Sequence, residues 1–153
     1  MQNENVTMEE LYPVLTEVLE SGGEFRFYPR GTSMLPLIKQ GRDSVVLAAI
    51  DSKPAKYDLC LYRRANGQFV LHRLMKWTKA GEPIFCGDNQ LVLEHGVTTE
   101  RMIARVVAVY RGEKRRELSG FSYRCYVRVH CFMPWRWLLF FPRRLKNFIK
   151  RHI

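Results

Sequence analysis

The chain lacks the features that mark exported, membrane-spanning and zinc-binding proteins. No stretch reaches the ~20 apolar residues that a transmembrane helix needs, and the opening "MQNENVTMEE" is polar and acidic, unlike a secretion signal. The four cysteines include no CxxC pair, so neither a zinc knuckle nor a thioredoxin-like site is indicated. We therefore expect no cleaved signal, no metal or other cofactor, reduced thiols and a cytoplasmic location.

Acidic residues are scarce in the last third of the chain. Residues 101–153 contain 14 Lys and Arg but only two Glu, a net charge of +12, whereas residues 1–100 have a net charge of −2. The whole chain of 153 residues is 46% hydrophobic, which suits one folded domain with a core. A local excess of cations is typical of a segment that meets an anionic surface.

The first 23 residues have the pattern of a helix. Thr7 and Glu10 are spaced as a capping box, and apolar residues follow at helical spacing up to the glycine pair at 22–23. Pro13 should kink this helix or delay its start. We expect an N-terminal helical segment over residues 1–23.

Residues 24–112 have the pattern of a sheet. Short apolar runs alternate with turn sequences at residues 25–29, 44–50, 59–63, 69–77 and 102–111. The Asn66-Gly67 pair predicts a hairpin over residues 59–77. The expected fold class is mainly β (α+β), with a compact, mainly antiparallel domain.

The tail, residues 113–153, combines aromatic and basic residues. Residues 121–131 alternate as in a strand, although Tyr126 makes the polar face ambiguous. The final stretch, "MPWRWLLFFPRRLKNFIKRHI", places residues 145, 148, 149 and 152 on one helical face. This mixture suits a helix in the plane of an anionic bilayer, so residues 132–153 are expected to meet a membrane surface. The alternative is that the aromatics pack on the β domain; no nucleic acid is expected, because no recognition motif is present.

Four residues are candidates for catalytic chemistry. Ser33 lies in "RGTSMLPLI", where a hydroxyl either caps a turn or acts as a nucleophile. A serine hydroxyl is a weak nucleophile that needs a base, and the base works best when a carboxylate fixes its tautomer. His72 lies within a strand pattern that would hold a base rigidly. Asp88, in the turn sequence "CGDN", and Glu94, six residues later, are the candidate carboxylates.

Taken in order, the sequences "GTSMLP", "VLHRL", "CGDN" and "MIARVVAVYRG" resemble the successive boxes of the signal peptidase I superfamily, serine peptidases that include the LexA-type self-cleaving repressors. The resemblance covers residues 24–112 and implies a catalytic domain of coiled β-sheets. It implies Ser33 as the nucleophile, and His72 as the base as in the archaeal and endoplasmic-reticulum type. Asp88 matches the family's Gly-Asp-Asn box, and Glu94 stands where the histidine type has its triad acid, so either could orient His72. The oxyanion would be bound by the Ser33 backbone N–H, because position 31, where some relatives supply a side-chain hydroxyl, is glycine here.

The implied function is a serine endopeptidase that cleaves a peptide or protein precursor through an acyl-enzyme. Because the family's N-terminal membrane helix has no counterpart, the site is expected to face the cytoplasm, either in solution or peripherally on that face of the membrane. A LexA-like repressor is not expected, because the 32 residues before Ser33 are too few for a DNA-binding domain plus a cleavage segment. The alternatives are an inactive relative that binds peptides or serves as a membrane adaptor, and a membrane-surface protein whose serine is structural. Since an imidazole titrates near pH 6.5, we expect activity to rise with pH near neutrality.

Overall fold

The computed structural model describes residues 6–152, with side chains as far as residue 142. It divides into two compact units, one ending at Leu118 and one beginning at Ser119. The first unit holds one α-helix, α1 (Met8–Glu20), a short 3-10 helix (Thr99–Arg101) and all seven strands of the described chain. The strands are β1 (Phe25–Phe27), β2 (Asp43–Ala48), β3 (Leu59–Arg63), β4 (Phe69–Trp77), β5 (Pro83–Cys86), β6 (Met102–Arg111) and β7 (Lys114–Glu117).

Helix α1 begins where its capping box predicts. The Thr7 hydroxyl accepts a hydrogen bond from the Glu10 backbone N–H at 3.3 Å, and Glu10 accepts one from the Thr7 N–H at 2.7 Å. Pro13 lies inside the helix and does not delay its start at Met8. Its ring removes one bond, to the carbonyl of Glu9, close to the helix start, so most of the hydrogen-bond ladder is kept.

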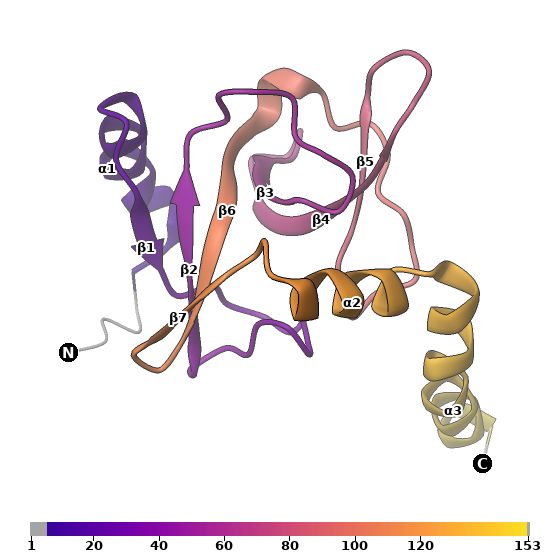
Figure 1. The fold of residues 1–153 in the computed structure, drawn as a ribbon. Coiled ribbons are helices and arrows are strands. Elements are labelled where there is room, and N and C mark those ends of the chain that lie inside the picture. Colours follow the sequence, from indigo (N-terminus) through magenta and orange to yellow (C-terminus); the bar gives the residue numbers. More distant parts are fainter. Residues whose placement is uncertain (1–5, 153) are drawn as a thin grey trace. The chain divides into compact units, whose positions relative to one another are not determined.

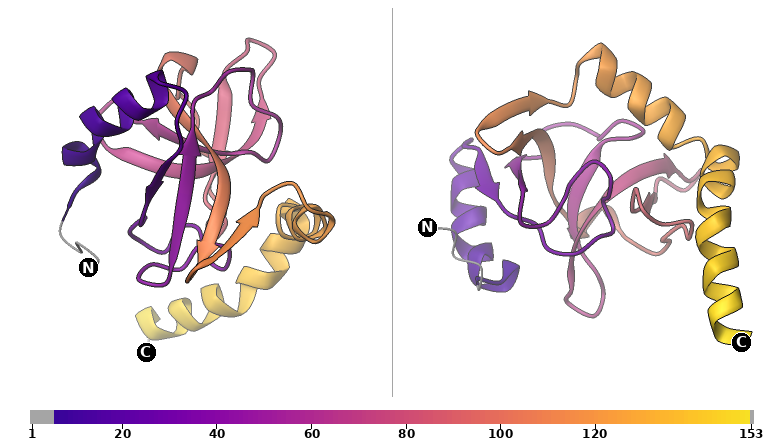
Figure 2. Two further views of the ribbon diagram at one scale, coloured as in Figure 1. Left: turned by 60° about the vertical axis from the view of Figure 1, so that its left-hand side comes forward. Right: turned by 90° about the horizontal axis from the view of Figure 1, so that it is seen from below.

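The strands form one antiparallel sheet, in the order β1-β2-β6-β3-β4-β5. Strand β7 pairs with the C-terminal end of β6. This confirms the expected α+β class with a mainly antiparallel sheet. Strands β3 and β4 curve away from the direction of β2 and β6, as Figures 1 and 2 show. The hairpin at Asn66-Gly67 is also confirmed, since β3 pairs with β4 and Gly67 adopts a φ of +89° that glycine favours.

Side chains on the two faces of the sheet belong to different hydrophobic clusters. Leu59 and Leu61 of β3 pack in the cluster that also contains Leu15 and Leu19 of α1. Cys60 and Tyr62, which alternate with them, pack in a second cluster with Val70, Leu74, Phe85 and Val97. Because successive residues of a strand point to opposite faces, the β3–β4 hairpin separates these two environments.

Strand β7 belongs to the sheet, although the sequence pattern placed its residues in the tail. Its four residues pair with β6 in register from Arg111↔Lys114 to Ala108↔Glu117. The charged run at 114–117 gives no apolar signal of a strand, because all four residues are exposed. Gly112, with a φ of +61°, lies in the tight turn that brings this run back onto β6.

The second unit is helical, so the strand pattern read over residues 121–131 was wrong. It consists of α2 (Phe121–His130) and α3 (Met133–His152). Aromatic rings at helical spacing stack along α2, with centroids 6.3 Å apart for Tyr123 and Tyr126 and 5.1 Å apart for Tyr126 and His130. Pairs three and four residues apart meet on a helix and not on a strand, which is the period that the alternation concealed. Among the described residues, no helix is both long enough and apolar enough to cross a bilayer.

Candidate functional site

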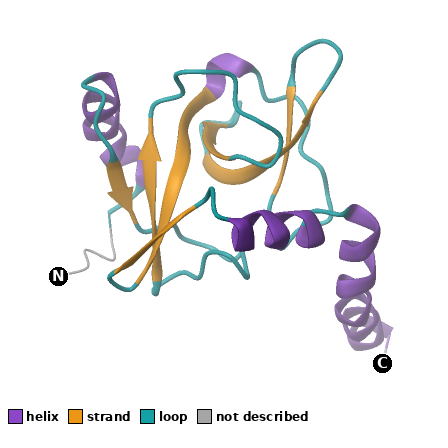
Figure 3. Ribbon diagram, viewed as in Figure 1, coloured by secondary structure: helices purple, strands orange, loops and turns teal. Residues whose placement is uncertain are grey.

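Ser33 lies in a turn-rich connection between β1 and β2 (Figure 3). Its neighbours Met34 and Ile38 are buried in the main core and are linked by a backbone hydrogen bond of 2.9 Å. Ser33 itself is only half-buried. The apolar residues of "SMLPLI" therefore anchor the turn in the core, while the serine stays partly accessible to solvent.

The "CGDN" turn that follows β5 packs directly on this serine. The Asn89 N–H donates to the Ser33 carbonyl at 2.7 Å, and the Asn89 side-chain amide donates to the Thr32 carbonyl at 3.1 Å. A Cβ on Gly87 would lie 2.7 Å from the Ser33 carbonyl oxygen, closer than real side chains approach. Asn89 thus binds the backbone at the candidate nucleophile, and the close approach of the turn requires glycine at position 87.

His72 is buried on β4 and is bound through its Nδ1 atom to the hydroxyl of Tyr62 on β3. The two atoms are 3.2 Å apart, and the Tyr62 hydroxyl donates in turn to a Glu94 carboxylate oxygen at 2.7 Å. The same Glu94 oxygen is 3.6 Å from His72 Nδ1. Of the two candidate carboxylates, Glu94 is therefore the one that the fold brings to the imidazole, mainly through a tyrosine.

Tyr62 and Glu94 are held in place by Phe85. The Tyr62 and Phe85 rings stack with centroids 4.3 Å apart and planes 19° from parallel. The backbones of Phe85 and Glu94 exchange two hydrogen bonds, of 3.0 and 2.7 Å, in an isolated β-bridge. One strand residue therefore positions both the phenol and the carboxylate.

This arrangement selects one tautomer of His72. A phenol has a single proton, and that proton is donated to Glu94, so the Tyr62 oxygen must accept from His72. Nδ1 then carries the proton of the neutral ring, and Nε2 keeps a free electron pair. An imidazole with an unprotonated Nε2 is the form that a general base requires.

Arg64 lowers the pKa values of both Glu94 and His72. Its guanidinium binds both Glu94 oxygens, at 2.5 and 2.7 Å, and these bonds, together with the one from Tyr62, lower the pKa of Glu94 even though burial opposes this. Burial lowers the pKa of His72 to about 4; Glu94 raises that pKa and Arg64 lowers it. His72 is therefore neutral at pH 7, and the titration step expected near neutrality moves to acid pH.

Asp88 has a different partner, on the other face of β4. Both its oxygens accept hydrogen bonds from the Arg73 guanidinium, at 2.7 and 2.6 Å, and both side chains are fully buried. Arg73 also donates to the Tyr57 carbonyl at 2.8 Å. Since Arg73 and His72 are adjacent strand residues, their side chains leave on opposite faces. The structure thus places Asp88 in a buried ion pair that anchors the turn beneath Ser33.

Replacing Asp88 by asparagine is expected to lower the free energy of unfolding by about 3–5 kcal/mol, because it leaves the Arg73 charge buried without its counterion. Denaturant unfolding followed by circular dichroism measures this. The matched control is Asp51→Asn, whose side chain is 76% exposed beside Arg105 and which should cost less than about 1 kcal/mol. A stable Asp88→Asn protein that had lost activity would instead show that Asp88 acts on His72.

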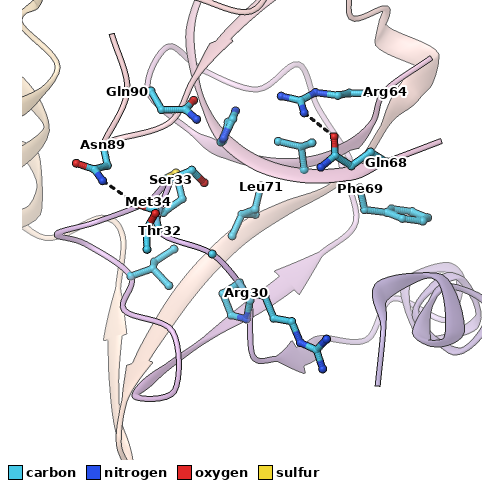
Figure 4. Close-up of a pocket in the computed structure, with 15 residues that line it drawn as sticks. Arg30, Thr32, Ser33, Met34, Arg64, Gln68, Phe69, Leu71, Asn89 and Gln90 are labelled. Atoms are coloured by element: carbon cyan, nitrogen blue, oxygen red, sulfur yellow. Dashed lines mark hydrogen bonds between the residues drawn. The ribbon is translucent and has the colours of Figure 1, made fainter. Parts of the chain in front are cut away.

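Ser33 and His72 line the same cavity, which has a volume of about 390 Å³. In Figure 4, Ser33, Asn89 and Gln90 lie at one side of it, Arg64, Gln68 and Phe69 lie at the other, and Leu71 lies between. Leu71, Val70 and Ile38 add apolar surface to a lining that is otherwise mostly polar. The cavity thus has polar groups at both ends, with Leu71 between them.

A second nucleophile near His72 is made inert by its surroundings. Cys60 is the residue of β3 directly opposite His72, and it is fully buried. Burial raises the pKa of its thiol to about 12, so it stays protonated at neutral pH. Among the described residues, no group of three or more His, Cys, Asp or Glu side chains could hold a metal ion.

Sequence reasoning missed Tyr62 and Arg64. The signal for Tyr62 was present in the hairpin: the Asn66-Gly67 turn sets a register with Tyr62 opposite Val70, which puts it diagonally across from His72. Arg64 gave no signal, because its partner Glu94 is 30 residues away. No protein-family model, curated protein or solved structure matches this chain.

Proposed function

We propose that this protein is a serine endopeptidase of the signal peptidase type, in which Ser33 attacks a peptide carbonyl and His72 acts as the base. The observation that carries the proposal is that Ser33 shares a cavity with a neutral His72 whose Nδ1 is occupied by Tyr62. The substrate is a peptide or protein precursor, in the cytosol or at the membrane. The resemblance of the four sequence boxes to that superfamily adds to this reading.

In the first step, His72 Nε2 takes the proton from the Ser33 hydroxyl as its oxygen bonds to the scissile carbonyl carbon. The Ser33 backbone N–H donates to the oxyanion of the tetrahedral intermediate. The imidazolium then gives its proton to the departing amine, the C–N bond breaks, and an ester to Ser33 remains. Water repeats the sequence with His72 as base, releasing the acid and restoring the serine.

Glu94, and not Asp88, is assigned to stabilise the imidazolium. Tyr62 transmits this effect, because its hydroxyl lies within hydrogen-bond distance of both His72 and Glu94. Tyr62 is a positioning residue, since it orients the ring without touching the substrate. Arg64 neutralises part of the Glu94 charge, which keeps the resting imidazole unprotonated.

A serine-reactive acylating probe tests the proposal. The full chain is incubated with the probe, and the adduct is located by mass spectrometry of its peptides. We expect one adduct, on Ser33, and a labelling rate that is constant from pH 8 to about 5 and falls as His72 is protonated near pH 4. An unlabelled Ser33, in a protein that still binds peptides, would favour a binding module over an enzyme.

A further inference from the structure

The part of helix α3 whose side chains the structure describes exposes most of its apolar residues. Leu138 and Phe141 are 61% and 58% exposed, whereas Arg136, on the opposite side of the same turn, is fully buried. A helix of a soluble protein normally buries the apolar arc and exposes the charged one. In the described part of α3 the order is the reverse: the arginine is buried and the apolar side chains are exposed.

The apolar arc extends along the helix. Leu138 and Phe141 are followed at helical spacing by residues 145, 148 and 149, which are Leu, Phe and Ile in the sequence. Trp135, Leu139 and Phe132 add further exposed apolar side chains at the start of the helix. Contiguous exposed apolar surface of this kind marks a binding surface.

The charge of this unit says what the surface meets. Residues 119–153 contain eight Lys and Arg and no Asp or Glu. Three of the eight, Arg136, Arg143 and Lys150, fall on the arc opposite to Leu138 and Phe141 when the helix is taken at 100° per residue, and the other cations of α3 lie at the borders between the two arcs. Cations on one arc with Trp, Phe and Leu on the other are typical of a helix that lies in the interface of an anionic bilayer.

We propose that α3 lies in the plane of a bilayer rich in anionic phospholipid, with Leu138 and Phe141 entering the acyl chains and its Lys and Arg residues contacting phosphate groups. This interaction is independent of the proposed peptidase activity. It would bring the chain to a membrane surface without a spanning helix.

The test measures partition of the full chain onto sedimented vesicles. Vesicles of phosphatidylcholine alone are compared with vesicles in which one lipid in three is phosphatidylglycerol. We expect binding to the second only, weakening as salt rises, because the Debye length falls from ~10 Å at 0.1 M to ~3 Å at 1 M. The emission of Trp135 and Trp137 should shift to the blue on binding.

Two variant pairs separate insertion from simple charge attraction. Leu138→Glu should weaken binding by at least about tenfold, because one buried side chain is lost from the bilayer. Val14→Glu on α1, an equally charged change at an exposed apolar residue, should weaken it by less than about twofold. Arg143→Gln with Arg144→Gln should weaken binding by about thirtyfold, at about 1 kcal/mol for each charge. Lys56→Gln with Lys79→Gln removes the same charge from exposed positions of the sheet unit as its control.

Leu138→Ala keeps a strong helix former and should give a smaller loss, of several fold, if Leu138→Glu were to disturb the helix. Circular dichroism checks that each variant keeps its helix content. Equal binding to both kinds of vesicle, or equal effects of Leu138→Glu and Val14→Glu, would overturn the proposal. Tighter binding to a DNA or RNA oligonucleotide than to vesicles, unaffected by Leu138→Glu, would assign the cations to nucleic acid instead.

Discussion

Replacing Ser33 by alanine is expected to abolish acylation by a serine-reactive probe and to lower peptide cleavage by roughly 10⁴-fold or more. The reason is that the serine oxygen forms the covalent bond with the carbonyl carbon. The fold should be unchanged, because Ser33 is half-buried and its backbone carbonyl, which binds Asn89, is kept. Probe labelling and turnover of a peptide library measure the loss.

Two controls accompany this variant. Ser52→Ala makes the same chemical change at an exposed serine and should leave labelling and cleavage unchanged. Thr32→Ala removes the neighbouring hydroxyl, while its carbonyl still accepts the Asn89 amide. If Ser33→Ala kept its label and Thr32→Ala lost it, Thr32 would be the reacting residue.

Replacing His72 by alanine is expected to lower peptide cleavage by about 10²–10⁴-fold, the range that a positioned base contributes. Lys76→Ala should keep most of the activity, because Lys76 is an exposed residue of the same strand. His72→Lys should not restore it. An amine must lose several units of pKa from ~10.4 to act as a base, whereas an imidazole starts near 6.5, and the Glu94 carboxylate beside this position favours the charged form. Near-normal turnover by His72→Ala, with loss in Lys76→Ala, would exclude the histidine-type site.

The pH dependence gives a sharper test of the His72 environment. Burial is the main cause that lowers the pKa of His72 to about 4. Of the neighbouring charges, Arg64 also lowers this pKa, whereas Glu94 and Asp88 raise it. Arg64→Gln should therefore move the acid limb of the activity profile to higher pH, and Glu94→Gln should move it to lower pH. Tyr62→Phe should keep the limb near its place but reduce the rate, because the ring loses its orienting hydroxyl. NMR titration of the imidazole measures the same pKa without any substrate.

The direction of the His72 pKa shift also predicts how the stability of the protein varies with pH. His72 titrates near 6.5 in the unfolded chain and near 4 in the folded one, so between these values the unfolded state binds more protons. The His72 contribution to stability is therefore complete above about pH 6.5 and is lost as the pH falls towards 4.

The activity profiles of Arg64→Gln and Glu94→Gln are expected to shift in opposite directions. Shifts of the acid limb that were equal in sign would show that these two charges do not act on His72.

Local sequence determined much of the secondary structure. Strands β3, β4 and β6 begin and end at the residues that their apolar runs predict, because a buried strand needs apolar side chains over its whole length. The capping box at Thr7 and Glu10 and the turn at Asn66-Gly67 act over three and two residues, so they too can be read from neighbours alone. Where local signals conflict, as over residues 121–131, the same reading was wrong.

Only the tertiary structure decided which carboxylate meets the histidine. Asp88 and Glu94 are close in sequence, and both follow β5, yet Asp88 binds Arg73 on one face of the sheet and Glu94 binds Tyr62 on the other. Strand alternation sends Arg73 to one face and His72 to the other, and the bridge between Phe85 and Glu94 carries the chain across to the His72 side. These pairings depend on the register of three strands at once. Contacts such as that of Arg64 with Glu94 cross 30 residues and leave no local pattern, which is why the sequence named the histidine and the serine but not the groups that set the pKa of the base.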